Sequence, residues 1–84
     1  MSPQRVRDAE TDRRVAEIVG NVLSVMVDEG AAVVAGDTIV ILESMKMEIP
    51  VLTEYDGVVR DVAVHAGDVV QEGDVLAVVD QVPA

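Results

Sequence analysis

The sequence predicts a small all-β domain, an antiparallel sandwich or flattened barrel with a pseudo-two-fold axis. Three observations predict it: an internal repeat, short β-branched runs bounded by glycine turns, and the lack of any convincing amphipathic helical period. The 84 residues are half apolar yet contain only one aromatic side chain, so the core must be aliphatic. Valine dominates it and favours strands, because its branched side chain suits a pleated surface. A chain of this length forms one domain at most.

The repeat is clearest in the glycines, which occupy positions that need positive φ or a close approach of two backbones. All six glycines pair at an offset of 37 residues, and so do several valines and one aspartate. The pairs are Gly20 with Gly57, Gly30 with Gly67, Gly36 with Gly73, Val22 with Val59, Val25 with Val62, Val27 with Val64, Val33 with Val70, and Asp37 with Asp74. We interpret this as two copies of one supersecondary unit of roughly 25 residues.

The elements follow in order along the chain. Residues 1–13 are polar and are expected to form a flexible N-terminal tail, residues 14–81 the domain, and residues 82–84 a short C-terminal tail. In each copy the first valines are spaced by three and then by two residues, which breaks strict alternation and predicts a β-bulge. Glycine turns follow, and the Asp after the second glycine is expected to bond nearby backbone N–H groups. Each copy then ends in an apolar run, residues 39–42 or 75–79, that predicts a strand.

The stretch ESMKME, residues 43–48, lies between two predicted strands, residues 39–42 and 49–52. Residues 44–47 must therefore reverse the chain in a β-hairpin whose tip carries Lys46, the only lysine of the protein, into solvent. Pro50 suits an edge strand or the start of a strand, where its missing N–H does no harm. A lone lysine in a turn is either a solvated side chain or an attachment point.

Charge and composition exclude several classes of function. A formal net charge of −10 disfavours nucleic acid and anionic membranes as partners. The chain has no cysteine, no apolar run long enough to cross a bilayer and no signal-peptide pattern, so we expect a cytoplasmic location. His65, the only histidine, reads as a solvated loop residue, and no metal site is expected because it has no candidate co-ligands.

Met45-Lys46-Met47, set in one hairpin between two Gly-Asp-bearing half-repeats, resembles the biotinyl domain of biotin-dependent carboxylases. The downstream stretch VHAGDVVQEGDVLAVVD is similar to the second half of biotinyl and lipoyl domains, and the resemblance covers roughly residues 15–80. It implies a flattened barrel of two four-stranded sheets with a modified lysine on an exposed hairpin. In length the chain also resembles small free-standing biotinylated proteins.

The resemblance implies a biotin carboxyl carrier rather than an enzyme. A biotin–protein ligase would join biotin to Lys46 by an amide. A biotin carboxylase would load carboxylate onto the biotin, and a carboxyltransferase would pass it to an acyl-CoA or a 2-oxo acid. The isolated domain is expected to be a monomer.

The flanks of Lys46 carry further expectations. Met45 and Met47 are either gap-filling core residues or, as we favour, the surface that the ligase reads. Glu43, Ser44 and Glu48 form the flanks of the hairpin, and the glutamates also keep its tip soluble. Ser44 stands where biotinyl domains commonly have alanine. A segment like Pro-Met-Pro before Gly20 and an insertion in the first unit are both absent, which weakens assignment to the carrier of bacterial acetyl-CoA carboxylases.

Two alternatives stay open. A lipoyl-type carrier would share the fold and the lysine, but lipoyl domains typically have Asp before the lysine and Ala after it, where this chain has methionines. The other alternative is an unmodified interaction module on the same fold.

Overall fold

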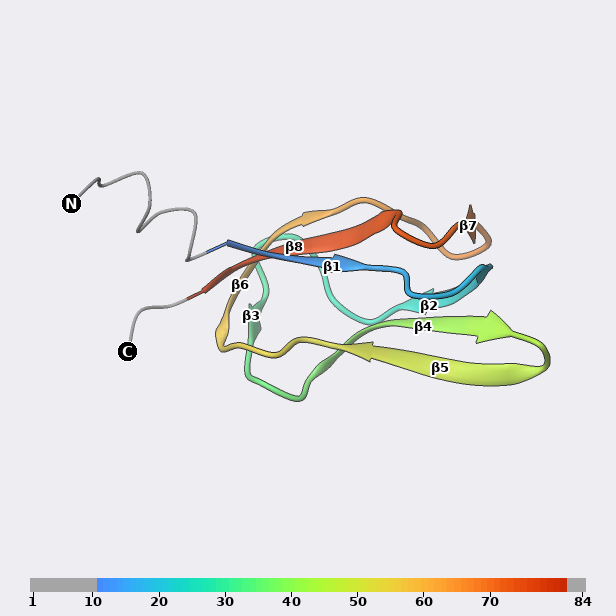
Figure 1. Cartoon of the computed structure of the whole chain (residues 1–84). Coiled ribbons are helices and arrows are strands. Elements are labelled where there is room, and N and C mark those ends of the chain that lie inside the picture. The colour runs from blue at the N-terminus through green and yellow to red at the C-terminus, as the bar shows by residue number, and fades with distance from the viewer. Residues whose placement is uncertain (1–10, 82–84) are drawn as a thin grey trace.

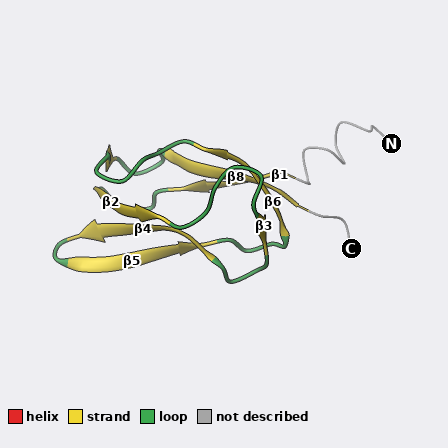
Figure 2. Ribbon diagram, turned by 180° about the vertical axis from the view of Figure 1, so that it is seen from behind, coloured by secondary structure: helices red, strands yellow, loops and turns green. Residues whose placement is uncertain are grey.

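The structure, a computed structural model, describes residues 11–81 as eight β-strands and no helix. The strands form two four-stranded antiparallel sheets, ordered β1-β8-β6-β3 and β5-β4-β2-β7 (Figure 1; Figure 2 shows the same strands from behind). Their bounds are β1 Thr11–Val15, β2 Gly20–Val25, β3 Ala32–Val33, β4 Thr38–Ser44, β5 Met47–Leu52, β6 Gly57–Val62, β7 Val69–Val70 and β8 Val75–Gln81. The predicted all-β sandwich is confirmed.

The N-terminal boundary needs one correction. Residues 11–13 were predicted to belong to the tail, but they pair with β8 as part of β1, from Thr11 opposite Asp80 to Arg13 opposite Val78. Their polar side chains gave no strand signal in the sequence, because an edge strand with one solvated face is not a continuous apolar run. The rest of the predicted N-terminal tail, residues 1–10, and the C-terminal tail, residues 82–84, lie outside the described residues.

The predicted repeat organises the whole architecture. Adding 37 to the bounds of β2, β3 and β4 gives those of β6, β7 and β8, and the same step takes residues 11–15 of β1 to residues 48–52, within β5. Exchanging these partners converts one sheet order into the other, which is what a pseudo-two-fold axis requires. The bulges obey the rule as well: the register shifts between Val22 and Ser24 in one copy and between Val59 and Asp61 in the other.

The turns also repeat, bond by bond. Gly36 and Gly73 have positive φ, 97° and 93°, and their N–H groups donate to the carbonyls of Thr53 and Ala16, both at 2.8 Å. The following aspartate in each copy accepts a hydrogen bond from the backbone three residues earlier: Val34 N donates to Asp37 at 2.9 Å, and Gln71 N to Asp74 at 2.8 Å. The predicted Gly-Asp turn chemistry is therefore confirmed in both copies.

The core lies between the sheets and is aliphatic, as predicted. β4 and β8 show the same burial pattern along their seven residues, so each copy contributes equally to the core. The largest fully buried side chains are Ile39, Leu42, Leu76, Val22, Val40, Val59, Val79 and Thr53. No helix among the described residues is long and apolar enough to span a membrane.

Candidate functional site

The hairpin formed by β4 and β5 is the part of the fold that carries Lys46. Ser44 and Met47 form the closing pair, so the loop contains only Met45 and Lys46. Both loop residues have positive φ, 54° and 66°, as a type I′ turn requires. This turn usually takes Asn and Gly, because other residues lose roughly 1–2 kcal/mol each in the left-handed region. The backbone conformation of the turn at the unique lysine is therefore unfavourable for the two residues that form it.

Lys46 is exposed at the tip of this turn (Figure 1, where the loop joins β4 to β5). Among residues 11–81, no ion pair holds its amine. The base of the hairpin is well anchored, because β4 is an inner strand that buries Ile39, Val40 and Leu42 completely or almost so. The predicted exposure of Lys46 at the tip of a β-hairpin is confirmed.

Met45 and Met47 do not fill the core, since 85% and 63% of their surfaces are exposed. Side chains this exposed bury little apolar surface, so they contribute little hydrophobic stabilisation. The structure excludes the packing interpretation for both residues. Their role in recognition by a ligase stays a prediction.

The flanking acids oppose one another across the hairpin, where Glu43 in β4 pairs with Glu48 in β5. Like charges directly opposite are mildly destabilising in an antiparallel pair. Glu48 is exposed and Glu43 and Ser44 are half-buried, so water screens the repulsion. Pro50 lies opposite Ile41 in β5, an edge strand, where the predicted tolerance for proline is met.

A groove next to the hairpin was not predicted from the sequence. It is lined by Glu17, Ile18, Val19, Ser44, Met45 and Glu72, and so combines the β1–β2 loop, the hairpin and the turn before β8. A comparison of the two repeats could have indicated this groove. The exposed apolar pair Ile18-Val19 corresponds, at the offset of 37, to Tyr55-Asp56, so a polar residue is replaced by an apolar one near the lysine.

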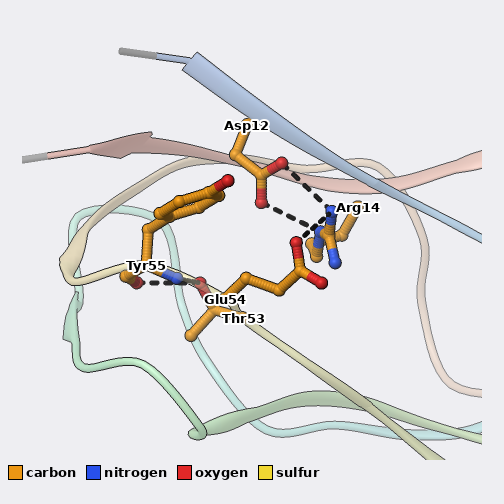
Figure 3. A network of polar contacts seen from close by, with 5 residues as sticks. All are labelled: Asp12, Arg14, Thr53, Glu54 and Tyr55. Atoms are coloured by element: carbon orange, nitrogen blue, oxygen red, sulfur yellow. Dashed lines mark hydrogen bonds and ion pairs between the residues drawn. The ribbon is translucent and has the colours of Figure 1, made fainter. Parts of the chain in front are cut away.

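A polar network lies where β1 of one sheet faces the connection after β5 of the other (Figure 3). Arg14 Nε lies 2.9 Å from Asp12 Oδ2, and Arg14 Nη2 lies 3.6 Å from Glu54 Oε1. Below them, the Thr53 hydroxyl donates to the Tyr55 carbonyl at 2.9 Å. The Arg14–Glu54 pair links β1 to the connection after β5, whereas the other two contacts are local. We interpret this network as structural.

His65 lies apart from Lys46 and is solvated, as predicted: its side chain is 90% exposed, and its Nδ1 lies 3.9 Å from Asp68 Oδ2. No group of His, Asp and Glu side chains within residues 11–81 could hold a metal ion. The reactive group that the hairpin presents to solvent is the amine of Lys46.

Comparison with known proteins agrees with this geometry. The model of the biotin/lipoyl family, described as biotin-requiring enzyme, matches residues 14–79. The chain belongs to this family. The biotinylated protein TB7.3 homolog of Mycobacterium leprae is 56% identical over 64 residues, which cover 76% of this chain and 90% of that protein. The biotinyl/lipoyl fold and the resemblance predicted from the sequence are both confirmed.

Two solved structures extend the biotin/lipoyl comparison. One is a single-chain, multi-domain long-chain acyl-CoA carboxylase, with 32% identity and a TM-score of 0.82, covering 98% of this chain and 8% of that one. The other is the lipoyl domain of the 2-oxoglutarate dehydrogenase complex from Azotobacter vinelandii, with 31% identity and a TM-score of 0.69, covering 77% of this chain and 82% of that domain.

Proposed function

We propose that the domain is a biotin carboxyl carrier whose biotin is joined by an amide to Nζ of Lys46. The observation that carries this proposal is the placement of the only lysine at the exposed tip of a two-residue turn, on a hairpin with a buried base. The residues present fit biotin, because attachment needs an accessible amine and nothing that encloses it. When bound, biotin supplies a ureido nitrogen that can accept and release a carboxylate.

The chain itself contributes position rather than catalysis. Lys46 Nζ loses a proton and gains the acyl carbon, while a ligase must activate the carboxyl group and supply the leaving group. A rigid domain with one long flexible arm then gives the arm a high effective concentration at two active sites. Those sites would belong to a biotin carboxylase and to a carboxyltransferase. Their acceptor would be an acyl-CoA or a 2-oxo acid, and the likeness to an acyl-CoA carboxylase supports the first.

A lipoyl carrier is the second candidate, and the similarity to a lipoyl domain is the observation that favours it. The identity of Met45 and Met47 argues for biotin, because lipoyl domains typically have Asp before the lysine and Ala after it. Both methionines are exposed where a ligase would meet them. A non-catalytic role is common to both candidates. The cytoplasmic location and the monomeric state stay predictions.

Intact mass distinguishes the candidates. The protein should be co-expressed with a biotin ligase and, separately, with a lipoyl ligase. We expect a biotin adduct on most of the chain in the first case and little modification in the second. Because Lys46 is the only lysine, digestion assigns the adduct unambiguously. A lipoyl adduct without a biotin adduct would replace the proposal by its rival, and no adduct with either ligase would favour the unmodified module.

The methionines can be tested by kinetics of the same reaction. Met45→Ala and Met47→Ala should each slow biotinylation by about ten-fold, the effect of losing roughly 1.4 kcal/mol of transition-state binding. Met26→Ala is the matched control, since Met26 is also exposed, at 54%, but lies outside the hairpin. Equal rates for all three variants would show that the ligase does not read these side chains.

A further inference from the structure

The groove beside Lys46 lies where the two repeats differ in chemistry. It has a volume of about 580 Å³ and is open to solvent. Three of its lining residues are exposed and apolar: Ile18 at 38%, Val19 at 50% and Met45 at 85%. Exposed apolar side chains gathered in one concave place mark a binding site more often than scattered ones do.

The equivalent loop in the other repeat is held by a hydrogen bond. There, Asp56 Oδ1 accepts a hydrogen bond from Ala35 N at 2.8 Å, which ties the loop after β5 to the turn before β4. At the offset of 37, Val19 stands for Asp56 and Glu72 stands for Ala35. Valine has no acceptor, so this bridge cannot form beside the hairpin. This bridge is thus present in one repeat and lacks its acceptor in the other, on the side that carries the lysine.

We propose that this groove is a resting site for the bicyclic ring of biotin carried by Lys46, an inference that rests on the proposed function. The sulfur-containing ring is apolar and suits the surface of Ile18, Val19 and Met45. The ureido ring offers two N–H donors and no charge, and the carboxylates of Glu17 and Glu72 are the acceptors that line the groove. Hydrogen bonds to carboxylates are stronger than those between neutral groups.

The tether is long enough for this contact. The lysine side chain and the acyl chain of biotin together span about ten bonds, or roughly 12 Å when extended. Ser44 and Met45, which line the groove, directly precede Lys46 in the chain. The groove is therefore within reach of a ring tethered to Lys46.

The same residues make the site selective for the uncharged ring. Glu17 and Glu72 would repel an anionic group, and because both are exposed to solvent this repulsion should weaken as salt is added. The groove would hold the arm at rest while the ring is neutral and would not take the ring back while it carries the carboxylate.

NMR of the biotinylated protein tests the inference. The full chain, with ¹³C-labelled Ile and Val methyl groups, should be biotinylated and its adduct verified by intact mass. We expect cross-peaks between biotin ring protons and the methyls of Ile18 and Val19, and chemical shifts there that differ from those of the unmodified chain. Glu17→Ala and Glu72→Ala should each reduce the cross-peak intensity by about half, because a charge-assisted hydrogen bond is lost.

A substitution that restores the missing hydrogen-bond acceptor allows the two repeats to be compared directly. Val19→Asp recreates the acceptor found at Asp56, so it should abolish the ring cross-peaks while the mass adduct persists. Val34→Asp is the matched control, because Val34 is also an exposed loop valine, at 57%, but lies in the turn before β4. It should leave the cross-peaks unchanged.

The outcomes separate the two proposals. An adduct on Lys46 with shift changes confined to residues 44–48, and no ring cross-peaks, would overturn the resting site and leave the carrier function standing. Retention of the cross-peaks in Val19→Asp would also overturn it. Absence of a biotin adduct would overturn the proposed function and the resting site together.

Discussion

The β4–β5 hairpin and the β8–β1 pair occupy equivalent places in the two repeats but differ in how they end. Their registers match at the offset of 37: Ile41 opposite Pro50 in one pair corresponds to Val78 opposite Arg13 in the other. One pair is closed by the turn that carries Lys46. The other pair is not joined by a turn, because its strands come from opposite ends of the chain. The unit is thus built twice, and only one copy ends in a turn that carries the proposed attachment site.

The charge pattern shows the same difference. Glu43 faces Glu48 near the tip of the hairpin, whereas the corresponding pair is Asp80 with Thr11. The hairpin therefore combines a like-charge pair with two non-glycine residues at positive φ. Unfavourable local features at an exposed tip indicate that function, rather than stability, selected its residues.

The largest expected effect tests whether the two repeats contribute equally to the core. Ile39→Ala and Leu76→Ala alter equivalent, fully buried positions. Each should lower the free energy of unfolding by about 3 kcal/mol, because a large aliphatic side chain is replaced by a cavity. Chemical denaturation would measure both. A cost for one variant less than half that for the other would show that the core is not symmetric in energy.

The sequence predicted the symmetric features well because each rests on backbone chemistry that few residues satisfy. Paired glycines such as Gly36 and Gly73 marked turns, and paired valines marked strands and a bulge, since both kinds of signal are local. The predicted hairpin also followed from strand lengths on either side of Lys46. These inferences needed no knowledge of which strands pair.

The asymmetric features were harder to predict. The start of the domain was predicted at residue 14, three residues after β1 begins, because Thr11, Asp12 and Arg13 are polar. The ion pair between Arg14 and Glu54 joins segments that only the folded chain brings together. The groove was not predicted for a similar reason. It joins segments separated by up to 55 residues, from Glu17 to Glu72, and no pattern within one segment indicates such a contact.

The next effect compares the two glycine turns. Gly36→Val and Gly73→Val should each destabilise the domain by more than roughly 1 kcal/mol, because a branched side chain at positive φ is strained. Ala35→Val is the control, since it adds the same side chain in the neighbouring exposed position, which has no positive φ. Thermal unfolding would rank the three variants. A neutral result at Gly36 or Gly73 would contradict the turn geometry.

A smaller effect of opposite sign is expected at the turn of the hairpin. Met45→Asn should raise the free energy of unfolding by about 0.5–1 kcal/mol, because asparagine tolerates left-handed φ better than methionine does. Met26→Asn, at an exposed residue without positive φ, should bring no such gain. The measurement is again denaturant unfolding. If both variants lost stability alike, the strain attributed to the turn would be absent.

The smallest effect on stability belongs to the residue with the largest effect on function. Lys46→Arg should change the free energy of unfolding by no more than about 0.5 kcal/mol, because the side chain is exposed and held by no described partner. It should nevertheless abolish the biotin adduct in intact mass. The informative companion is the double variant Lys46→Arg with Arg60→Lys, which moves the only lysine to an exposed site, 63% accessible, on β6 in the other repeat. We expect no adduct there, because Arg60 sits within a strand and lacks a projecting turn. Biotinylation at position 60 would show that any exposed amine on this scaffold suffices, and the contrast between the two repeats would then have no bearing on attachment.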